Sequence, residues 1–283
     1  MDLHDIDSIL DRQGSTTLKF TTAQALMRSV RQSSNDVLYV EGVSAEDFAN
    51  IEKLRGENLP FRLKNFSQAE RLLIITVPTL CNERMHSTLY DYIKYEIAAM
   101  GLRYSWSNLN AATMRAENGG SVVEGDSAGV PTGPNGDAQR WPTLVIEGGY
   151  SQSINALVRQ AKSWFIASQH QVKIVLLMKL NRSPPGEIII EQWKELRSQG
   201  RPGATTTRGF DSLVPSRIQR ITIQKTLPSA DPWNSMSYRV SRGPLELEFA
   251  DIFLRAPGPG EGNIVVGDQD LRELGAAVAR LPP

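Results

Sequence analysis

The chain has 283 residues, of which 40% are apolar and 22% are charged, a composition typical of a globular protein with a substantial core. Lysine and arginine together number 31, as do aspartate and glutamate, so the chain as a whole has no net charge to attract nucleic acid. Cys81 is the single cysteine, which excludes an intrachain disulfide and a zinc site built from several thiolates.

The sequence shows neither a membrane span nor a secretory signal. Its strongest apolar runs, at residues 72–77 and 174–178, are far shorter than the roughly 20 apolar residues that cross a bilayer. The first seven residues are acidic and lack the basic and apolar regions of a signal peptide. We therefore expect no membrane segment and an intracellular protein, cytoplasmic or nuclear.

The first third of the chain predicts strands that alternate with helices. A strand at residues 37–40 leads to Ser44, which is expected to cap the helix that follows it. A second strand, at residues 72–77, ends at a proline, and a long helix is expected from about residue 83 to residue 100.

That long helix carries Glu96 within the stripe of apolar residues formed by Leu89, Ile93 and Ile97. An unpaired buried carboxylate is costly, so a carboxylate in this place is expected to be paired or bound to a metal. His86 projects to the same side of the helix. The alternatives are an ordinary salt bridge for Glu96 and an ordinary polar contact for His86.

Two further carboxylates flank a predicted hairpin. Residues 119–140 are rich in glycine, proline, asparagine and aspartate, which predicts loops and turns, and they contain Asp126. The apolar strand 144–147 follows and ends at Glu147. A hairpin that carries Asp126 close to Glu147 would create a divalent-metal site. Taken alone, an Asp between Gly and Ser is more often part of a turn than a metal ligand.

The rest of the chain predicts a covered sheet with an extension. A helix with an apolar face at residues 154–165 and an apolar strand at 172–180 predict a parallel crossover from strand 144–147. A strand at residues 188–190 is expected to be antiparallel. The strands of a C-terminal β extension are expected at residues 221–223, 238–240 and 245–249.

This succession of elements resembles the core of the restriction-endonuclease-like PD-(D/E)XK superfamily over residues 72–193. The resemblance is strongest to endonucleases predicted in cyanobacteria, whose strand, Glu and Ser pattern is similar to residues 142–151 (PTLVIEGGYS). The chain also resembles a group of fungal proteins that share segments similar to residues 141–153, 201–208 and 258–262.

The resemblance implies an α/β fold, more fully an α+β mixed sheet with flanking helices. It divides the chain into an N-terminal helical and βα extension (1–66), a restriction-endonuclease-like core (67–200) and a C-terminal β extension packed on the core (201–283). In that superfamily three carboxylates hold Mg²⁺ or Mn²⁺, and a lysine assists the attacking water. The metal ligands carried over are Glu96, Asp126 and Glu147.

The chain departs from the family pattern at two positions. Gly149 stands two residues beyond Glu147, where the family has its lysine, and Thr143 stands where the family has an aspartate. The lysine is then expected on the following helix as Lys162, with Gln160 as the alternative. The residues predicted to be catalytic are Asp126, Glu147 and Lys162.

These residues lead to a prediction of a metal-dependent nuclease that hydrolyses phosphodiester bonds of nucleic acid. The alternative is a catalytically inactive nuclease-like module that binds nucleic acid or a protein partner, which the missing lysine and the zero net charge favour. A serine hydrolase built around Ser151 is a third interpretation, but the sequence there lacks the Gly-x-Ser-x-Gly elbow.

Overall fold

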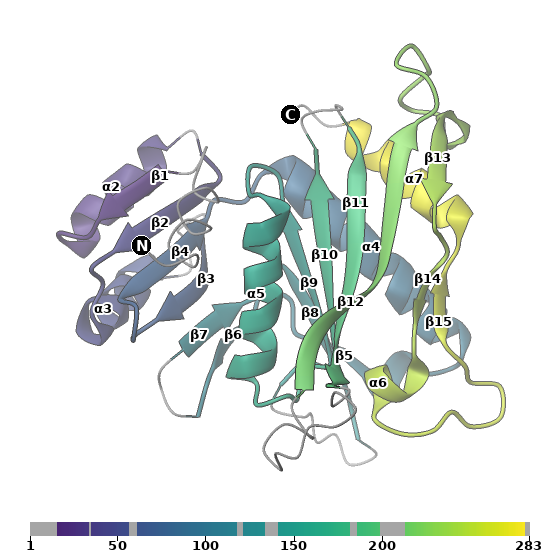
Figure 1. Cartoon of the computed structure of the whole chain (residues 1–283), viewed down its shortest axis with the longest axis horizontal. Coiled ribbons are helices and arrows are strands. Elements are labelled where there is room, and N and C mark those ends of the chain that lie inside the picture. The colour runs from purple at the N-terminus through teal and green to yellow at the C-terminus, as the bar shows by residue number, and fades with distance from the viewer. Residues whose placement is uncertain are drawn as a thin grey trace, which may run out of the picture.

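A computed structural model describes residues 16–33, 35–56, 61–117, 121–133, 141–181, 186–198 and 213–280 (Figure 1). In this part of the chain the strands form a six-stranded sheet, a seven-stranded sheet and a two-stranded sheet, with helices packed on them. The predicted mixed α/β fold is therefore confirmed. Residues 134–140 of the predicted loop region and the segment 201–208 lie outside the described residues.

The six-stranded sheet, here called the N-terminal sheet, has the strand order β1-β2-β4-β3-β7-β6. Its strands are β1 (Thr16–Lys19), β2 (Val37–Glu41), β3 (Arg62–Ser67), β4 (Leu72–Thr76), β6 (Thr113–Arg115) and β7 (Ser121–Glu124). The β1 and β2 strands pair in parallel, and the other neighbours are antiparallel. The boundary proposed at residue 66 falls inside β3, which pairs with β4 on one side and β7 on the other.

Helices α2 (Ala23–Gln32) and α3 (Ala45–Arg55) pack on this sheet through buried apolar residues (Figure 1). The α3 helix begins as predicted, because the Ser44 side chain accepts a hydrogen bond from the Asp47 backbone N–H while the Asp47 carboxylate accepts from the Ser44 N–H. Phe48 of α3 stacks on Phe66 of β3 with the ring centres 4.3 Å apart. The N-terminal sheet thus has an apolar core of its own.

The seven-stranded sheet, here called the central sheet, has the strand order β13-β12-β11-β10-β9-β8-β5. Its strands are β5 (Trp106–Asn108), β8 (Ser127–Pro131), β9 (Leu144–Gly149), β10 (Ile174–Leu180), β11 (Ile188–Arg197), β12 (Leu213–Lys225) and β13 (Tyr238–Ser241). As predicted, β9 and β10 are parallel and are joined by helix α5 (Ile154–Ala167), whereas β11 is antiparallel to β10.

The C-terminal segment only partly follows the prediction. The β12 and β13 strands extend the central sheet, as expected for residues 221–223 and 238–240. The expected strand at 245–249 instead ends early: β14 (Leu245–Leu247) pairs with β15 (Ile264–Val266) in the two-stranded sheet, and helix α6 (Phe249–Phe253) begins directly after it.

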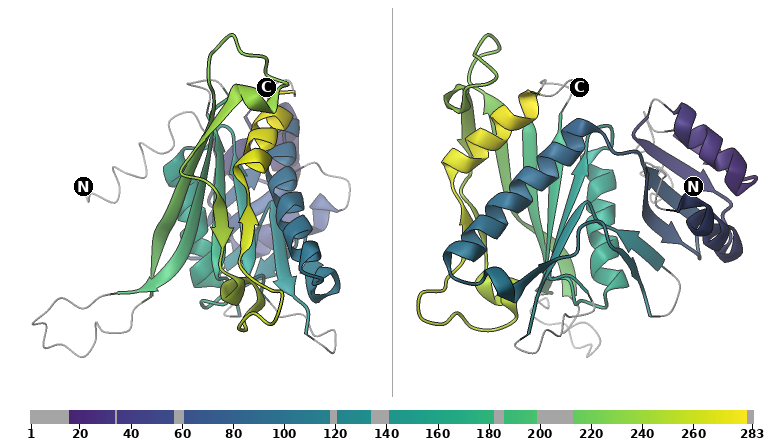
Figure 2. Two further views of the ribbon diagram at one scale, coloured as in Figure 1. Left: turned by 90° about the vertical axis from the view of Figure 1, so that its right-hand side faces the viewer. Right: turned by 180° about the vertical axis from the view of Figure 1, so that it is seen from behind.

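Helices cover the central sheet on both faces. Helix α4 (Leu80–Ala99) and helix α7 (Asp268–Ala279) lie on one face, and α5 lies on the other (Figure 2). Because successive residues of a strand point to opposite faces, Leu144 and Ile146 of β9 join the core under α4 and α7, while Val145 joins the core under α5. Glu147 therefore also faces the α5 side. No helix of the described residues is both long and apolar enough to cross a membrane.

Candidate metal centre at the junction of the two sheets

The chain passes directly from the N-terminal sheet to the central sheet at Gly125 and Asp126, which separate β7 from β8. The Asp126 backbone N–H donates to the Ile146 carbonyl at 3.1 Å, and Oδ2 of Asp126 accepts from the Gly148 N–H at 2.7 Å. The antiparallel pairing of β8 with β9 therefore brings Asp126 beside Glu147, two residues before the end of β9.

A lysine from the N-terminal sheet lies between these two carboxylates. In β3, Leu63 and Asn65 face consecutive residues of β4, so Lys64 is the extra residue of a β-bulge, a feature that redirects side chains. Its Nζ lies 2.8 Å from Oδ1 of Asp126 and also contacts Oε2 of Glu147. The side chains are enclosed, because that of Lys64 is 0% exposed and those of Asp126 and Glu147 are each 1% exposed.

Helix α5 completes the surroundings of Glu147. The indole N–H of Trp164 donates to Oε1 of Glu147 at 2.5 Å, and Trp141 packs edge-on against the same indole. Gln160, one turn before Trp164, is buried, and neither its amide oxygen nor its amide nitrogen has a hydrogen-bond partner among the described residues. The carboxylate thus has a fixed orientation in an apolar and aromatic environment.

The electrostatics of the cluster follow from this burial. Burial raises the pKa of Glu147 to about 7, although Lys64 acts in the opposite direction. Burial would also raise the pKa of Asp126, but the cations Lys64 and Arg62 outweigh it and lower that pKa. Burial opposes the charge of Lys64, yet its two carboxylate neighbours raise its pKa. At neutral pH, Lys64 is therefore an ammonium group and Asp126 a carboxylate, and Glu147 is the group poised to exchange a proton.

The first turns of α4 add Glu83 and His86 to the cluster. Glu83, His86 and Asp126 each offer one ligand atom, and these atoms all lie within 4.8 Å of one another. Nη2 of Arg62 donates to both carboxylate oxygens of Glu83, at 2.7 and 2.8 Å, and Nη1 of Arg62 contacts Asp126. Nδ1 of His86 lies 2.9 Å from the Ser127 hydroxyl.

The structure brings together some of the predicted site residues and separates others. Asp126, Glu147 and His86 lie in the cluster. Glu96 does not, because it follows His86 by ten residues, about 15 Å along a helix, and it is partly exposed. Lys162 is exposed on α5, since a residue two positions from Trp164 lies on the opposite side of the helix. The alternative to Lys162, Gln160, is the buried one.

Three residues of the cluster, Arg62, Lys64 and Glu83, escape the sequence prediction. Strand β3 pairs with the rest of its sheet through long-range contacts, and a bulge that redirects Lys64 leaves no periodic pattern in the sequence. Glu83 had a usable signal: it precedes His86 by three residues, which places both side chains on one face of a helix.

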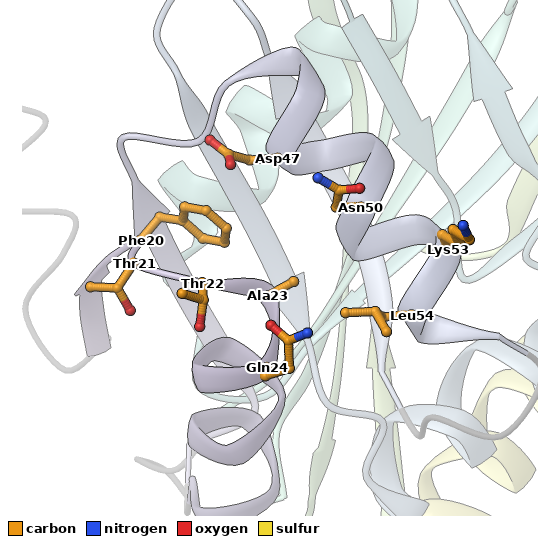
Figure 3. Close-up of a pocket in the computed structure, with 9 residues that line it drawn as sticks. All are labelled: Phe20, Thr21, Thr22, Ala23, Gln24, Asp47, Asn50, Lys53 and Leu54. Atoms are coloured by element: carbon orange, nitrogen blue, oxygen red, sulfur yellow. The ribbon is translucent and has the colours of Figure 1, made fainter.

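A cavity of about 480 Å³ lies apart from this cluster, between the start of α2 and α3 (Figure 3). Its lining includes Phe20, Thr22, Asn50 and Lys53, and no residue of the cluster. The carboxylate cluster is therefore not the floor of this cavity.

Comparison with known proteins gives little further guidance. No protein-family model and no curated protein matches the chain. Among solved structures, the chain is similar to a candidate nuclease belonging to DUF820 from Anabaena variabilis ATCC 29413, with 13% sequence identity and a TM-score of 0.35. The match covers 53% of this chain and 79% of that one. At this level the similarity assigns neither a family nor an activity to the chain.

Proposed function

We propose that the chain is a metal-dependent hydrolase of phosphodiester bonds in nucleic acid, with its centre at Asp126, Glu147 and Lys64. The observation that supports this proposal is the contact of one lysine amine with both carboxylates. The two carboxylates supply the oxygen ligands that a hard divalent cation such as Mg²⁺ or Mn²⁺ takes, and a bound cation would share them with the Lys64 ammonium group. Asp126 and Glu147 would hold the cation.

Each residue has a distinct part in this proposal. A bound divalent cation would lower the pKa of a water molecule and offset the charge that develops on the phosphate. Lys64, which forms ion pairs with both carboxylates, holds them at a fixed separation and would take the role predicted from the sequence for Lys162. Glu147 would act as a ligand in its ionised form, with its orientation fixed by the hydrogen bond from the Trp164 indole N–H.

Replacement of Glu147 by glutamine tests the proposal. The variant keeps the side-chain shape and an acceptor for Trp164 but removes the negative charge, so we expect cleavage of labelled DNA and RNA with Mg²⁺ or Mn²⁺ to fall at least about 100-fold. Glu96→Gln, a carboxylate of α4 outside the cluster, is the matched control and should cleave like the wild type. Equal cleavage by wild type and Glu147→Gln would refute the assignment.

A second candidate function, a non-catalytic nuclease-like module that binds nucleic acid or a protein, is favoured by the enclosure of the cluster. Taken as whole residues, Lys64, Asp126 and Glu147 are only 2%, 4% and 1% exposed. In this conformation their ion pairs mainly stabilise the contact between the two sheets. This function predicts that the wild-type protein cleaves neither DNA nor RNA with any divalent cation and still binds its partner after Glu147→Gln.

A further inference from the structure

On the side nearest solvent, the cluster consists of Glu83, His86 and Asp126, so it includes an imidazole in addition to carboxylates. Glu83 and His86 project from one face of α4 toward Asp126, and the three ligand atoms converge within 4.8 Å. The Glu83 side chain is 37% exposed, whereas that of Asp126 is 1% exposed. An ion from solution could therefore reach this group through Glu83 without opening the core around Lys64.

The histidine gives an independent sign that this group takes a ligand. His86 is 3% exposed, and its Nε2 makes no hydrogen bond, although Oε2 of Glu83 lies 3.4 Å away. Its Nδ1 is 2.9 Å from the Ser127 hydroxyl, whose oxygen can accept a hydrogen bond from Nδ1–H; in that neutral tautomer the Nε2 lone pair is directed at the carboxylates. A buried polar atom without a partner is uncommon and requires an explanation.

Arg62 supplies positive charge between the two carboxylates Glu83 and Asp126. Its guanidinium donates to both oxygens of Glu83 and contacts Asp126, so it supplies the positive charge that the pair requires. The Arg62 side chain is 13% exposed, at the edge of the cluster. A cation that binds Glu83 and Asp126 would compete directly with this guanidinium.

We infer that Glu83, His86 and Asp126 form a divalent-metal site that prefers Mn²⁺ or Co²⁺ to Mg²⁺, and that Arg62 is its internal competitor. The preference follows from the imidazole ligand, because nitrogen suits first-row transition metals and Mg²⁺ favours oxygen. The inference rests on the proposed function for the use of the metal, but the binding site itself can be tested without any activity.

The test combines calorimetric titration with Mn²⁺, Co²⁺ and Mg²⁺ and pulsed electron paramagnetic resonance of bound Mn²⁺. We expect the wild type to bind Mn²⁺ at least about 10-fold more tightly than Mg²⁺ and to show coupling of Mn²⁺ to an imidazole nitrogen. His86→Gln should lose both the preference for Mn²⁺ over Mg²⁺ and the coupling to nitrogen. The matched control is His170→Gln, which removes the surface histidine paired with Glu195 and should change neither.

Replacement of Arg62 provides a gain-of-affinity test. Arg62→Gln should tighten Mn²⁺ binding several-fold, because the competing guanidinium is gone. The control is Arg55→Gln, which breaks the neighbouring Arg55–Glu124 pair, with its two hydrogen bonds of 2.7 and 2.9 Å, and should leave Mn²⁺ affinity unchanged.

Three results would overturn the inference: no nitrogen coupling in the wild type, equal affinity for Mn²⁺ and Mg²⁺, or no gain from Arg62→Gln over its control. The wild-type spectrum and the Arg62 variant decide the question even if His86→Gln does not fold. Metal binding without cleavage would refute the proposed hydrolase and leave this site standing. Cleavage with Mg²⁺ by a wild-type protein that shows no nitrogen-coupled Mn²⁺ would leave the proposed hydrolase standing and refute this site.

Discussion

Replacement of Lys64 by methionine would show how much the enclosed ion pairs stabilise the fold. Methionine keeps the unbranched stem of lysine, so Asp126 and Glu147 lose their shared cation while most of the packing remains. Loss of one partner from a buried ion pair typically costs about 3–5 kcal/mol. Asp126 still has its ion pair with Arg62, and Glu147, with a pKa of about 7, can take up a proton. We therefore expect the loss of unfolding free energy to lie at the lower end of this range, about 3 kcal/mol at pH 7.

Urea unfolding followed by tryptophan fluorescence, with EDTA present, measures this free energy. In the double variant Lys64→Met, Glu147→Gln, no charge is left unpaired at Glu147, and Trp164 can still donate to the amide oxygen. The double variant should therefore lose at least about 1 kcal/mol less than the sum of the single variants. Lys94→Met is the control, because Lys94 pairs with Asp91 at the surface of α4, and such pairs contribute about 0–1 kcal/mol. Additive effects, or equal costs for Lys64→Met and Lys94→Met, would refute the reasoning.

Three further predictions concern the surrounding fold. Ser44→Ala removes the capping box of α3 and should lower the free energy of unfolding by about 1 kcal/mol in the same assay, whereas Ser87→Ala within α4 should have little effect. Thr143→Val removes the hydroxyl that donates to the Ile252 carbonyl at 2.8 Å and leaves that carbonyl unpaired, so a loss of about 1–3 kcal/mol is expected, and a loss near zero would contradict a role for this bond. Burial raises the pKa of Tyr90, so its phenol should remain protonated in the folded protein at pH values where an unfolded tyrosine, with a pKa of 10.0, ionises. Its contribution to stability is complete below about pH 10 and declines as the pH rises further. Tyr90→Phe should therefore reduce the fall in unfolding free energy above pH 10, and an unchanged fall would contradict this.

Local patterns in the sequence were sufficient to predict most of the central sheet. The strands at 144–147 and 172–180 and the helix between them have clear periodicity, and the parallel pairing of β9 with β10 confirms the crossover. The prediction of a strand at 245–249 was partly wrong. Buried apolar residues alternate with exposed glutamates from Leu245 to Phe249, but only the first three residues form a strand, and a helix begins at Phe249. Periodicity over five residues does not distinguish these two outcomes.

The cluster was harder to predict because it depends on contacts between distant segments. Chain order alone placed Asp126 near the end of β9, since the two flank a hairpin. Glu96 was chosen because it falls within the apolar stripe of α4. In the structure it lies at the margin of that stripe, in the last turns of α4, whereas the first turns of the helix carry Glu83 and His86 to the cluster. Lys64 reaches the cluster from another sheet through a bulge, and only the tertiary structure shows this contact.

The two-residue passage from β7 to β8 also bears on how the protein unfolds. The segment from β5 to β8 begins in the central sheet, crosses to the N-terminal sheet and returns through Gly125 and Asp126. A methyl group added at Gly125 would lie 3.2 Å from Val145 and 3.4 Å from Trp164, so little free volume remains at this crossing. We expect that separation of the two sheets would strain this two-residue connection or withdraw β7 or β8 from its sheet. The two sheets should consequently melt in a single cooperative transition, and a fragment that starts at residue 67 would lack most of β3 and have no independent native state.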